Sequence, residues 1–145
     1  MEQSAQGAVD AAYPIRTIIH PMHRAARILI AEDEPIVALD LGETVIALGH
    51  VLEGYATSAA DAFSQVEARR PDLVLMDIRL GLSDGVAAAR RIRTRFGLPV
   101  VFVSAFATDL DRRGLADLGP VVPKPFVPET LERAIRQALD DGAAA

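Results

Sequence analysis

Apolar and polar positions follow two patterns along most of this chain. Short runs of mainly apolar residues are typical of strands in a parallel sheet, and they occur at 27–31, 51–56, 72–77, 100–104 and 120–123. Stretches in which apolar residues recur every three or four positions indicate helices, which we predict at 35–48, 59–69, 85–95, 107–118 and 128–140. Strands that alternate with helices in this way predict an α/β fold with right-handed crossovers and a doubly wound, five-stranded parallel sheet.

Local signals at the helix ends support this division. Pro35 and Pro128 suit first helical positions, where a missing N–H costs nothing. Gly49 is a stop signal at the end of the first helix. The helix at 107–118 has the weakest support, because Gly114 in its middle costs about 1 kcal/mol relative to alanine.

Polar residues follow four of the apolar runs at the point where each run ends. They are Glu32 and Asp33 after the first run, Asp77 after the third, Ser104 and Lys124. Ligands of open α/β sheets bind at the carboxyl ends of the strands. We therefore expect three carboxylates, a hydroxyl and an ammonium group to meet at one edge of the sheet.

This set of groups predicts a site for a divalent cation and a phosphoryl group. Magnesium prefers oxygen ligands and takes one or two carboxylates from the protein, which Glu32, Asp33 and Asp77 can supply. A carboxylate can also attack phosphorus and form an acyl phosphate, and Asp77 ends the central apolar run. Mg²⁺, Lys124 and Ser104 would each bind one phosphoryl oxygen, since phosphoryl transfer depends mainly on positioning and charge neutralisation.

Each of these residues also has a common structural role. A lone aspartate or serine at a strand end, such as Asp77 or Ser104, often caps a helix. The acidic pair Glu32 and Asp33, just before Pro35, suits a helix N-terminus because negative charge complements the helix dipole. All of these residues occur at successive strand ends, however, and this coincidence favours a functional site.

Composition narrows the function further. The chain of 145 residues is 50% apolar, which is enough for one domain with a proper core. It has no cysteine, which excludes disulfides and thiolate metal sites. A net charge of −5 argues against nucleic acid as the main partner, and the four arginines between 90 and 95 are most simply a solvated helix face. No apolar stretch approaches the ~20 residues of a membrane span, so we expect a soluble, cytoplasmic protein.

The first 24 residues differ from the rest of the chain. They show no sustained periodicity, and they lack the ~7–15 consecutive apolar residues of a signal peptide. We expect a flexible N-terminal extension at 1–24 and a single domain at 25–145.

Five sequence motifs resemble those of one protein family. They are Ile-Ala-Glu-Asp-Glu-Pro at 30–35, Leu-Val-Leu-Met-Asp-Ile-Arg-Leu at 73–80, Asp-Gly at 84–85, Val-Phe-Val-Ser-Ala at 101–105 and Lys-Pro-Phe at 124–126. Together they resemble the receiver domain of two-component response regulators, over about residues 27–139. The resemblance implies a flavodoxin-like fold with strand order 2-1-3-4-5.

The resemblance also implies a role for each residue at the strand ends. It implies that Glu32 and Asp33 bind Mg²⁺ and that the backbone carbonyl of Arg79 completes the metal shell. Asp77, itself a metal ligand, would accept phosphate from a sensor histidine kinase or a histidine phosphotransferase. Ser104 and Lys124 would bind the phosphoryl oxygens, and the bond from Lys124 to Pro125 would be cis.

The chain departs from the family pattern at two positions. Gly81 stands where the family often has proline, which should loosen the loop after Asp77. Val121, three residues before the lysine, stands where the family usually has a switch tyrosine or phenylalanine. The stretch 99–106 resembles a degenerate form of the PFxFATG(G/Y) motif of the FAT GUY regulators, which also lack the late aromatic. We therefore predict that Phe106, together with Ser104, forms the switch.

Rival functions fit the sequence less well. A phosphatase of the haloacid dehalogenase type needs an acid two residues after the nucleophile, where this chain has Arg79. A flavodoxin-like nucleotide-binding protein needs a glycine-rich loop after the first strand, where Glu32 and Asp33 would repel phosphate. A pseudo-receiver that binds partners without phosphorylation stays as the alternative.

The expected function is that of a stand-alone receiver rather than an enzyme. Only one helix follows Lys124, which leaves no room for an output domain of typical size. Such a protein would catalyse only its own Mg²⁺-dependent phosphorylation and dephosphorylation. It would signal by binding a downstream protein, which the sequence does not identify, or by relaying phosphate.

Overall fold

The computed structural model describes residues 25–105 and 117–144. The strands of the main sheet are β1 (Arg27–Ala31), β2 (Val51–Ala56), β3 (Leu73–Met76), β6 (Val100–Ser104) and β7 (Val121–Pro123). The described helices are α2 (Pro35–Ala47), α3 (Ala59–Arg69), α4 (Gly85–Phe96) and α6 (Pro128–Ala144). Two short strands, β4 (Arg79–Leu80) and β5 (Ser83–Asp84), form an antiparallel hairpin between β3 and α4.

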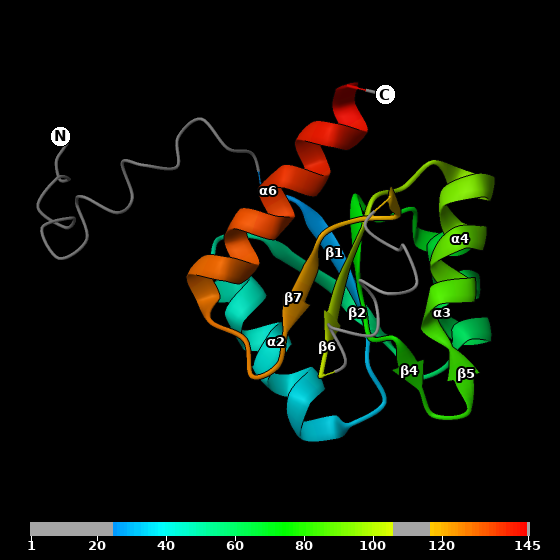
Figure 1. The fold of residues 1–145 in the computed structure, drawn as a ribbon, viewed down its shortest axis with the longest axis horizontal. Helices are drawn as coiled ribbons and strands as arrows, with labels where there is room; N and C mark the ends of the chain where they lie inside the picture. Colours follow the sequence, from blue (N-terminus) through cyan, green and yellow to red (C-terminus); the bar gives the residue numbers. More distant parts are fainter. Residues whose placement is uncertain (1–24, 106–116, 145) are drawn as a thin grey trace, which may run out of the picture.

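The main sheet is parallel throughout and has the order β2-β1-β3-β6-β7. In terms of its five strands this is the predicted order 2-1-3-4-5, so the predicted fold is confirmed. Figure 1 shows α2 and α6 on one side of the sheet and α3 and α4 on the other. The domain is therefore a three-layer α/β/α sandwich.

The predicted strands and four of the five predicted helices agree with the structure to within a few residues. The largest difference is at the end of α6, which continues to Ala144 rather than ending at 140. The fifth predicted helix, at 107–118, lies outside the described residues except for its last two positions. The β4–β5 hairpin was not predicted, because two-residue strands leave no periodic signal. None of the helices in the described parts of the chain is long and apolar enough to cross a membrane.

Successive strand residues point to opposite faces of the sheet and so build two separate cores. On β1, Leu29 and Ala31 join the core beneath α3 and α4, whereas Ile28 and Ile30 join the core beneath α2 and α6. The central strand β3 is buried along its whole length. The edge strand β2 is more exposed, because it has a neighbour on one side only.

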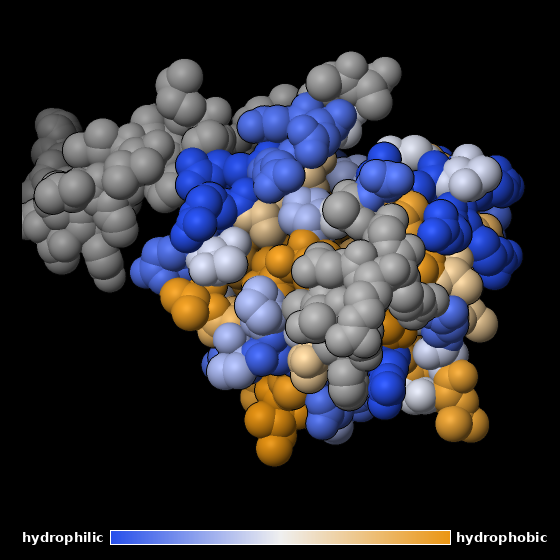
Figure 2. Space-filling model, in the orientation of Figure 1, coloured by the Kyte–Doolittle hydropathy of each residue, from blue (hydrophilic) through white to orange (hydrophobic). Residues whose placement is uncertain are grey.

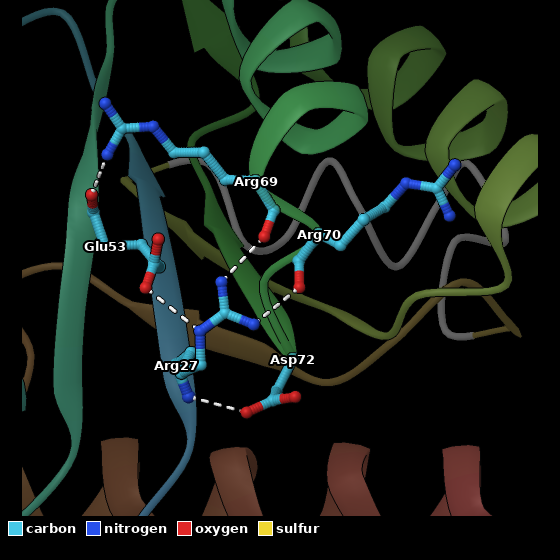
Figure 3. Close-up of polar contacts among 5 residues, drawn as sticks. All are labelled: Arg27, Glu53, Arg69, Arg70 and Asp72. Carbon is cyan, nitrogen blue, oxygen red and sulfur yellow. Dashed lines mark hydrogen bonds and ion pairs between the residues drawn. The ribbon is translucent and has the colours of Figure 1, made fainter.

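Arg27 connects four chain segments at the amino ends of the strands (Figure 3). Its guanidinium pairs with Glu53 of β2 (Nε to Oε2, 3.0 Å) and donates to the carbonyl oxygens of Arg69 and Arg70, at the end of α3. Its backbone N–H donates to the Asp72 carboxylate just before β3. The hydrogen bond with Glu53 raises the pKa of Arg27 and lowers the pKa of Glu53. The guanidinium therefore satisfies carbonyls at the helix C-terminus while it ties α3 to the sheet.

Two glycines allow backbone segments to pass unusually close to one another. A Cβ atom on Gly85, at the start of α4, would overlap the carbonyl oxygen of Asp77. A Cβ atom on Gly119 would overlap the carbonyl oxygen of Val100, where the chain approaches β6 before β7 begins. Both contacts are with backbone atoms, which cannot rotate away.

We predict that Gly119→Ala lowers the free energy of unfolding by about 1–3 kcal/mol, the usual cost of an overpacked site. Gly142→Ala is the matched control, because its Cβ would make ordinary contacts with Pro99 at 3.5 Å or more. Chemical denaturation of both variants and the parent protein measures the difference. Equal stability of the two variants would contradict the close packing of Gly119 on Val100.

Candidate functional site

The carboxyl ends of β1, β3 and β7 bring four of the predicted site residues together. The Nζ atom of Lys124 lies 2.7 Å from Oε1 of Glu32 and 3.3 Å from Oδ2 of Asp77. Glu32, Asp33 and Asp77 each present a carboxylate oxygen, and these oxygens all lie within 4.8 Å of one another. The three expected carboxylates and the expected ammonium group therefore lie together at one edge of the sheet.

Backbone hydrogen bonds fix the positions of these residues beyond the ends of the strands. The N–H of Glu32 donates to the carbonyl of Ala56, and the N–H of Asp77 donates to the carbonyl of Ala31. The N–H of Lys124 donates to the carbonyl of Ser104. The hydrogen-bonding pattern of the parallel strands therefore extends to the site residues.

The Lys124–Pro125 peptide bond is cis, as the family resemblance implied. Lys124 directs its ammonium group at the two carboxylates, and Phe126 just beyond packs against the core beneath α2 and α6. The loop is therefore anchored on both sides of Pro125.

The site concentrates negative charge at a buried position. Glu32 is 1% exposed and Asp77 is 8% exposed, and Lys124 is the cation that both carboxylates contact. Burial raises the pKa of Glu32, although the hydrogen bond from Lys124 acts against this rise. Burial also acts to lower the pKa of Lys124, but the hydrogen bond with Glu32 and the charge of Asp77 outweigh it and raise that pKa.

The Asp77 carboxylate faces a pocket that is open to solvent. The pocket has a volume of about 340 Å³ and is lined by Asp33, Glu34, Asp77, Arg79, Gly81, Ala105 and Lys124. Oδ2 of Asp77 contacts Lys124, and Oδ1 accepts a hydrogen bond from the Arg79 N–H at 3.4 Å. A small phosphoryl-sized group can therefore approach the carboxylate from the pocket.

Of the two predicted switch residues, Ser104 and Phe106, the structure describes only Ser104. Ser104 is fully buried as the last residue of β6, and Ala105 rather than Ser104 lines the pocket. Phe106 lies outside the described residues, so its predicted role stays a prediction. Val121 is half-buried in β7 and packs against the core beneath α3 and α4.

Sequence analysis did not assign Glu34, Gly81 or Ala105 to the site, but all three line the pocket. Glu34 lines the pocket and donates its N–H to Oε2 of Glu32 at 3.2 Å. Ala105 lines it from the end of β6. Glu34 belongs to the acidic run at 32–34, which is the one signal that pointed to it, whereas an alanine gives no such signal.

The three carboxylates also fit a hard divalent cation. All the side-chain donors at the cluster are oxygens, and Asp33 is the most accessible of the three acids. Mg²⁺ binds through one or two carboxylates and retains several waters, which an open pocket permits. The residues present are therefore suited to magnesium.

Comparison with known proteins identifies the family of this chain. The sequence profile of one protein family, the response regulator receiver domain, matches residues 28–136. The chain belongs to the response regulator receiver family. The receiver domain is a signalling domain, which agrees with the expectation that this domain acts as a regulator.

Two curated relatives are regulators from bacteria. The chain is 36% identical to the phyllosphere-induced regulator PhyR of Methylorubrum extorquens over 117 residues, which cover 79% of this chain and 44% of the relative. It is also 36% identical to the transcriptional regulatory protein PdtaR of Mycobacterium tuberculosis over 116 residues, which cover 78% of this chain and 56% of the relative. The chain thus spans about half the length of the curated relatives it matches.

Solved structures show the same fold. The response regulator PhyR from Brucella abortus is 34% identical with a TM-score of 0.73, and the match covers 83% of this chain and 50% of that one. The signal receiver domain of a modulated diguanylate cyclase from Desulfovibrio desulfuricans is 27% identical with a TM-score of 0.75. That match covers 83% of this chain and 98% of the other.

We predict that Lys124→Gln lowers the free energy of unfolding by roughly 1–3 kcal/mol in the presence of a chelator. The substitution leaves the buried Glu32 carboxylate beside Asp77 without its cation. The double variant Lys124→Gln/Glu32→Gln should recover most of that loss, because the buried charge is gone as well. Urea denaturation at neutral pH measures all the variants.

Arg133→Gln is the control, since Arg133 is an exposed basic residue on α6 and its loss should change stability by less than about 0.5 kcal/mol. Additive losses in the double variant would show that Lys124 and Glu32 do not depend on each other.

Proposed function

We propose that this protein is a phosphorylation-dependent receiver in which Asp77 accepts a phosphoryl group from a histidine. One carboxylate oxygen of Asp77 attacks the phosphorus of a phosphohistidine. The phosphorus–nitrogen bond breaks as the acyl phosphate forms, and the donor imidazole leaves. The observation that carries the proposal is the position of Asp77: it ends the central strand, contacts Lys124 and faces the open pocket.

Lys124 and the surrounding acids provide the electrostatics for this transfer. The incoming phosphoryl group carries up to two negative charges and would be repelled by three carboxylates alone. Mg²⁺ would be held by Glu32, Asp33 and Asp77 with the carbonyl of Arg79, and it would supply positive charge to the phosphoryl group. The Lys124 ammonium would supply more positive charge, and Glu32 holds that ammonium in place.

Ser104, at the end of β6, is the remaining residue proposed to bind the phosphoryl group. Its carbonyl oxygen accepts a hydrogen bond from the Lys124 N–H, so the end of β6 is joined to the Lys124 backbone. We propose that its hydroxyl binds a phosphoryl oxygen once phosphate is present, and that Phe106 then repacks as the aromatic part of the switch.

The alternative is a pseudo-receiver that binds partners without phosphorylation. The geometry favours the phosphorylated form, because Lys124 contacts Glu32 and Asp77, and Asp33 completes a group of carboxylates within 4.8 Å of one another. A binding module that never takes up phosphate has no need of three clustered acids, which repel one another.

We predict that Asp77→Asn abolishes labelling by a small acyl phosphate while the fold is retained. Asparagine keeps the shape of the side chain and removes the nucleophilic oxygen. The measurement is the mass shift of intact protein after incubation with the phosphodonor and Mg²⁺. Labelling of the parent protein should also disappear when a chelator removes the metal.

Two further variants sharpen this test. Asp33→Asn should reduce labelling to the level seen without metal, although Asp77 is intact. Asp84→Asn should label normally, because Asp84 caps α4 through hydrogen bonds from Val86 and Ala87, and asparagine caps a helix equally well. Parent protein that gains no mass would support the pseudo-receiver alternative.

The phosphodonor is proposed to be a protein, namely a sensor histidine kinase or a histidine phosphotransferase. Large apolar side chains are exposed around the pocket: Ile36 at the start of α2 (82% exposed), Leu82 in the β4–β5 turn (108%) and Val127 after the Lys124 loop (52%). Figure 2 shows hydrophobic groups projecting beneath α2 and beside the β4–β5 hairpin. A phosphorylated small molecule would not bury such a rim, whereas a docked protein would.

We predict that Leu39→Ser slows phosphoryl transfer from a cognate protein donor by about tenfold, the loss expected for one apolar side chain buried at an interface. Labelling by the small acyl phosphate should not change, since Leu39 does not line the pocket. Ile46→Ser is the matched control: both side chains are 57% exposed on α2, but Ile46 lies two turns farther from the site. An equal effect of the two substitutions would argue against docking at the pocket end of α2.

A further inference from the structure

The outer side of α3 and α4 carries two phenylalanines in contact. Phe63 of α3 and Phe96 of α4 have ring centroids 5.2 Å apart, with the planes tilted by 49°. Both are partly buried and pack against the core beneath these helices. The pair closes the seam between α3 and α4 at the surface.

Three arginine side chains stack over these two rings. The guanidinium carbon of Arg91 lies 4.3 Å from the centroid of Phe63. Those of Arg70 and Arg95 lie 4.7 and 5.3 Å from the centroid of Phe96. All three distances are within the range of a favourable cation–π interaction. We call Arg70, Arg91 and Arg95 the arginine platform.

The platform holds its guanidinium groups in place before any partner binds. Arg70 also donates from Nε to the carbonyl oxygen of Glu67 at 3.3 Å, and Figure 3 shows its side chain extending toward α4. Stacking and this hydrogen bond restrict the side-chain rotamers, which lowers the entropy lost when a ligand is bound. The N–H edges of a stacked guanidinium remain available to an incoming anion.

Positive charge on the platform is only partly balanced. Arg95 lies 3.8 Å from Glu67, and both side chains are more than half exposed. Within the described residues, Arg70 and Arg91 have no carboxylate within ion-pair distance. Three cations gathered around two touching rings repel one another, and this occurs in a chain whose net charge is −5. An anionic ligand would relieve that repulsion.

We propose that the arginine platform binds an acidic segment of a partner protein, through aspartate or glutamate carboxylates. The planar fork of arginine matches a carboxylate with two parallel hydrogen bonds. Figure 2 shows hydrophilic residues over the outer part of α4, where such a segment would lie in contact with water at its edges. Charge complementarity would speed the encounter and fix the register of the segment.

Other anionic partners fit this surface less well. Single-stranded nucleic acid binds by stacking its bases on free aromatic faces, but guanidiniums already cover Phe63 and Phe96. A membrane surface would also require exposed apolar side chains for insertion. Across the described ranges, large exposed apolar side chains lie on α2, on β2 and in loops, with none on α3 or α4.

The test uses the full chain and a fluorescein-labelled peptide of eight glutamates as the probe. Fluorescence anisotropy measures affinity at low and moderate salt, and NMR chemical shifts of the labelled protein locate the binding face. We expect shifts confined to α3 and α4, and an affinity that falls as salt is added. Arg91→Gln/Arg95→Gln should weaken binding by roughly five- to tenfold, as expected for two exposed charge pairs.

The matched control is Arg90→Gln/Arg133→Gln, which removes the same net charge from exposed arginines that do not stack on either ring. Circular dichroism must show that both double variants stay folded. Equal weakening in the control, or shifts centred on other elements, would overturn the proposal. So would tighter binding at this face by an oligonucleotide of eight nucleotides or by anionic phospholipid vesicles.

Discussion

The hydrogen-bonded ladders that join β1 to β2, β1 to β3 and β6 to β7 are the constraint on which the site depends. These strands are short, but their ladders continue by one residue into Glu32, Asp77 and Lys124. A parallel sheet ends all its strands at one edge, so the functional side chains need no further element to bring them together. A shift of one residue in any ladder would turn a site side chain to the other face of the sheet. The site is thus as precise as the register of the core strands.

At the amino ends of the strands, one residue makes most of the corresponding contacts. Arg27 joins β1 to β2 through Glu53, to α3 through two carbonyl oxygens and to β3 through Asp72. These contacts are largely exposed, so water weakens each of them. They stabilise the fold through their number rather than through the strength of any one contact. The Lys124 contacts at the carboxyl ends of the strands are fewer and less exposed to water. The two ends of the sheet therefore differ: the contacts at the amino ends are numerous and exposed, and those at the carboxyl ends are shielded and lie within the site.

How far the sequence predicts this structure depends on the kind of information each residue carries. Buried strands such as β3 are apolar along their length, and Pro35 and Pro128 mark helix starts, so these elements were predicted closely. The acids and Lys124 were predicted because each follows a buried strand. Close contacts between residues that are far apart in the sequence leave no such pattern. Gly42 weakens the pattern of α2, and only the structure shows that the Tyr55 ring fills the place of its side chain.

The arginines of α4 show the same limit most clearly. Their sequence pattern is that of a solvated helix face, and the exposure of Arg91 and Arg95 agrees with this reading. Arg91 stacks on Phe63 from 28 positions away in the sequence, and Arg70 stacks on Phe96 from 26 positions away, so no local pattern reveals these contacts.

Helix α4 is the element that joins the two surfaces described above. Its first residue, Gly85, lies against the carbonyl of Asp77 and donates its N–H to Ile78 at 2.6 Å. Its last turn carries Arg95 and Phe96. A helix of 12 residues is about 18 Å long and moves as a rigid unit, because its hydrogen bonds resist bending. Any rearrangement of the loop after Asp77 must therefore move α4 as a whole or be absorbed at Gly85.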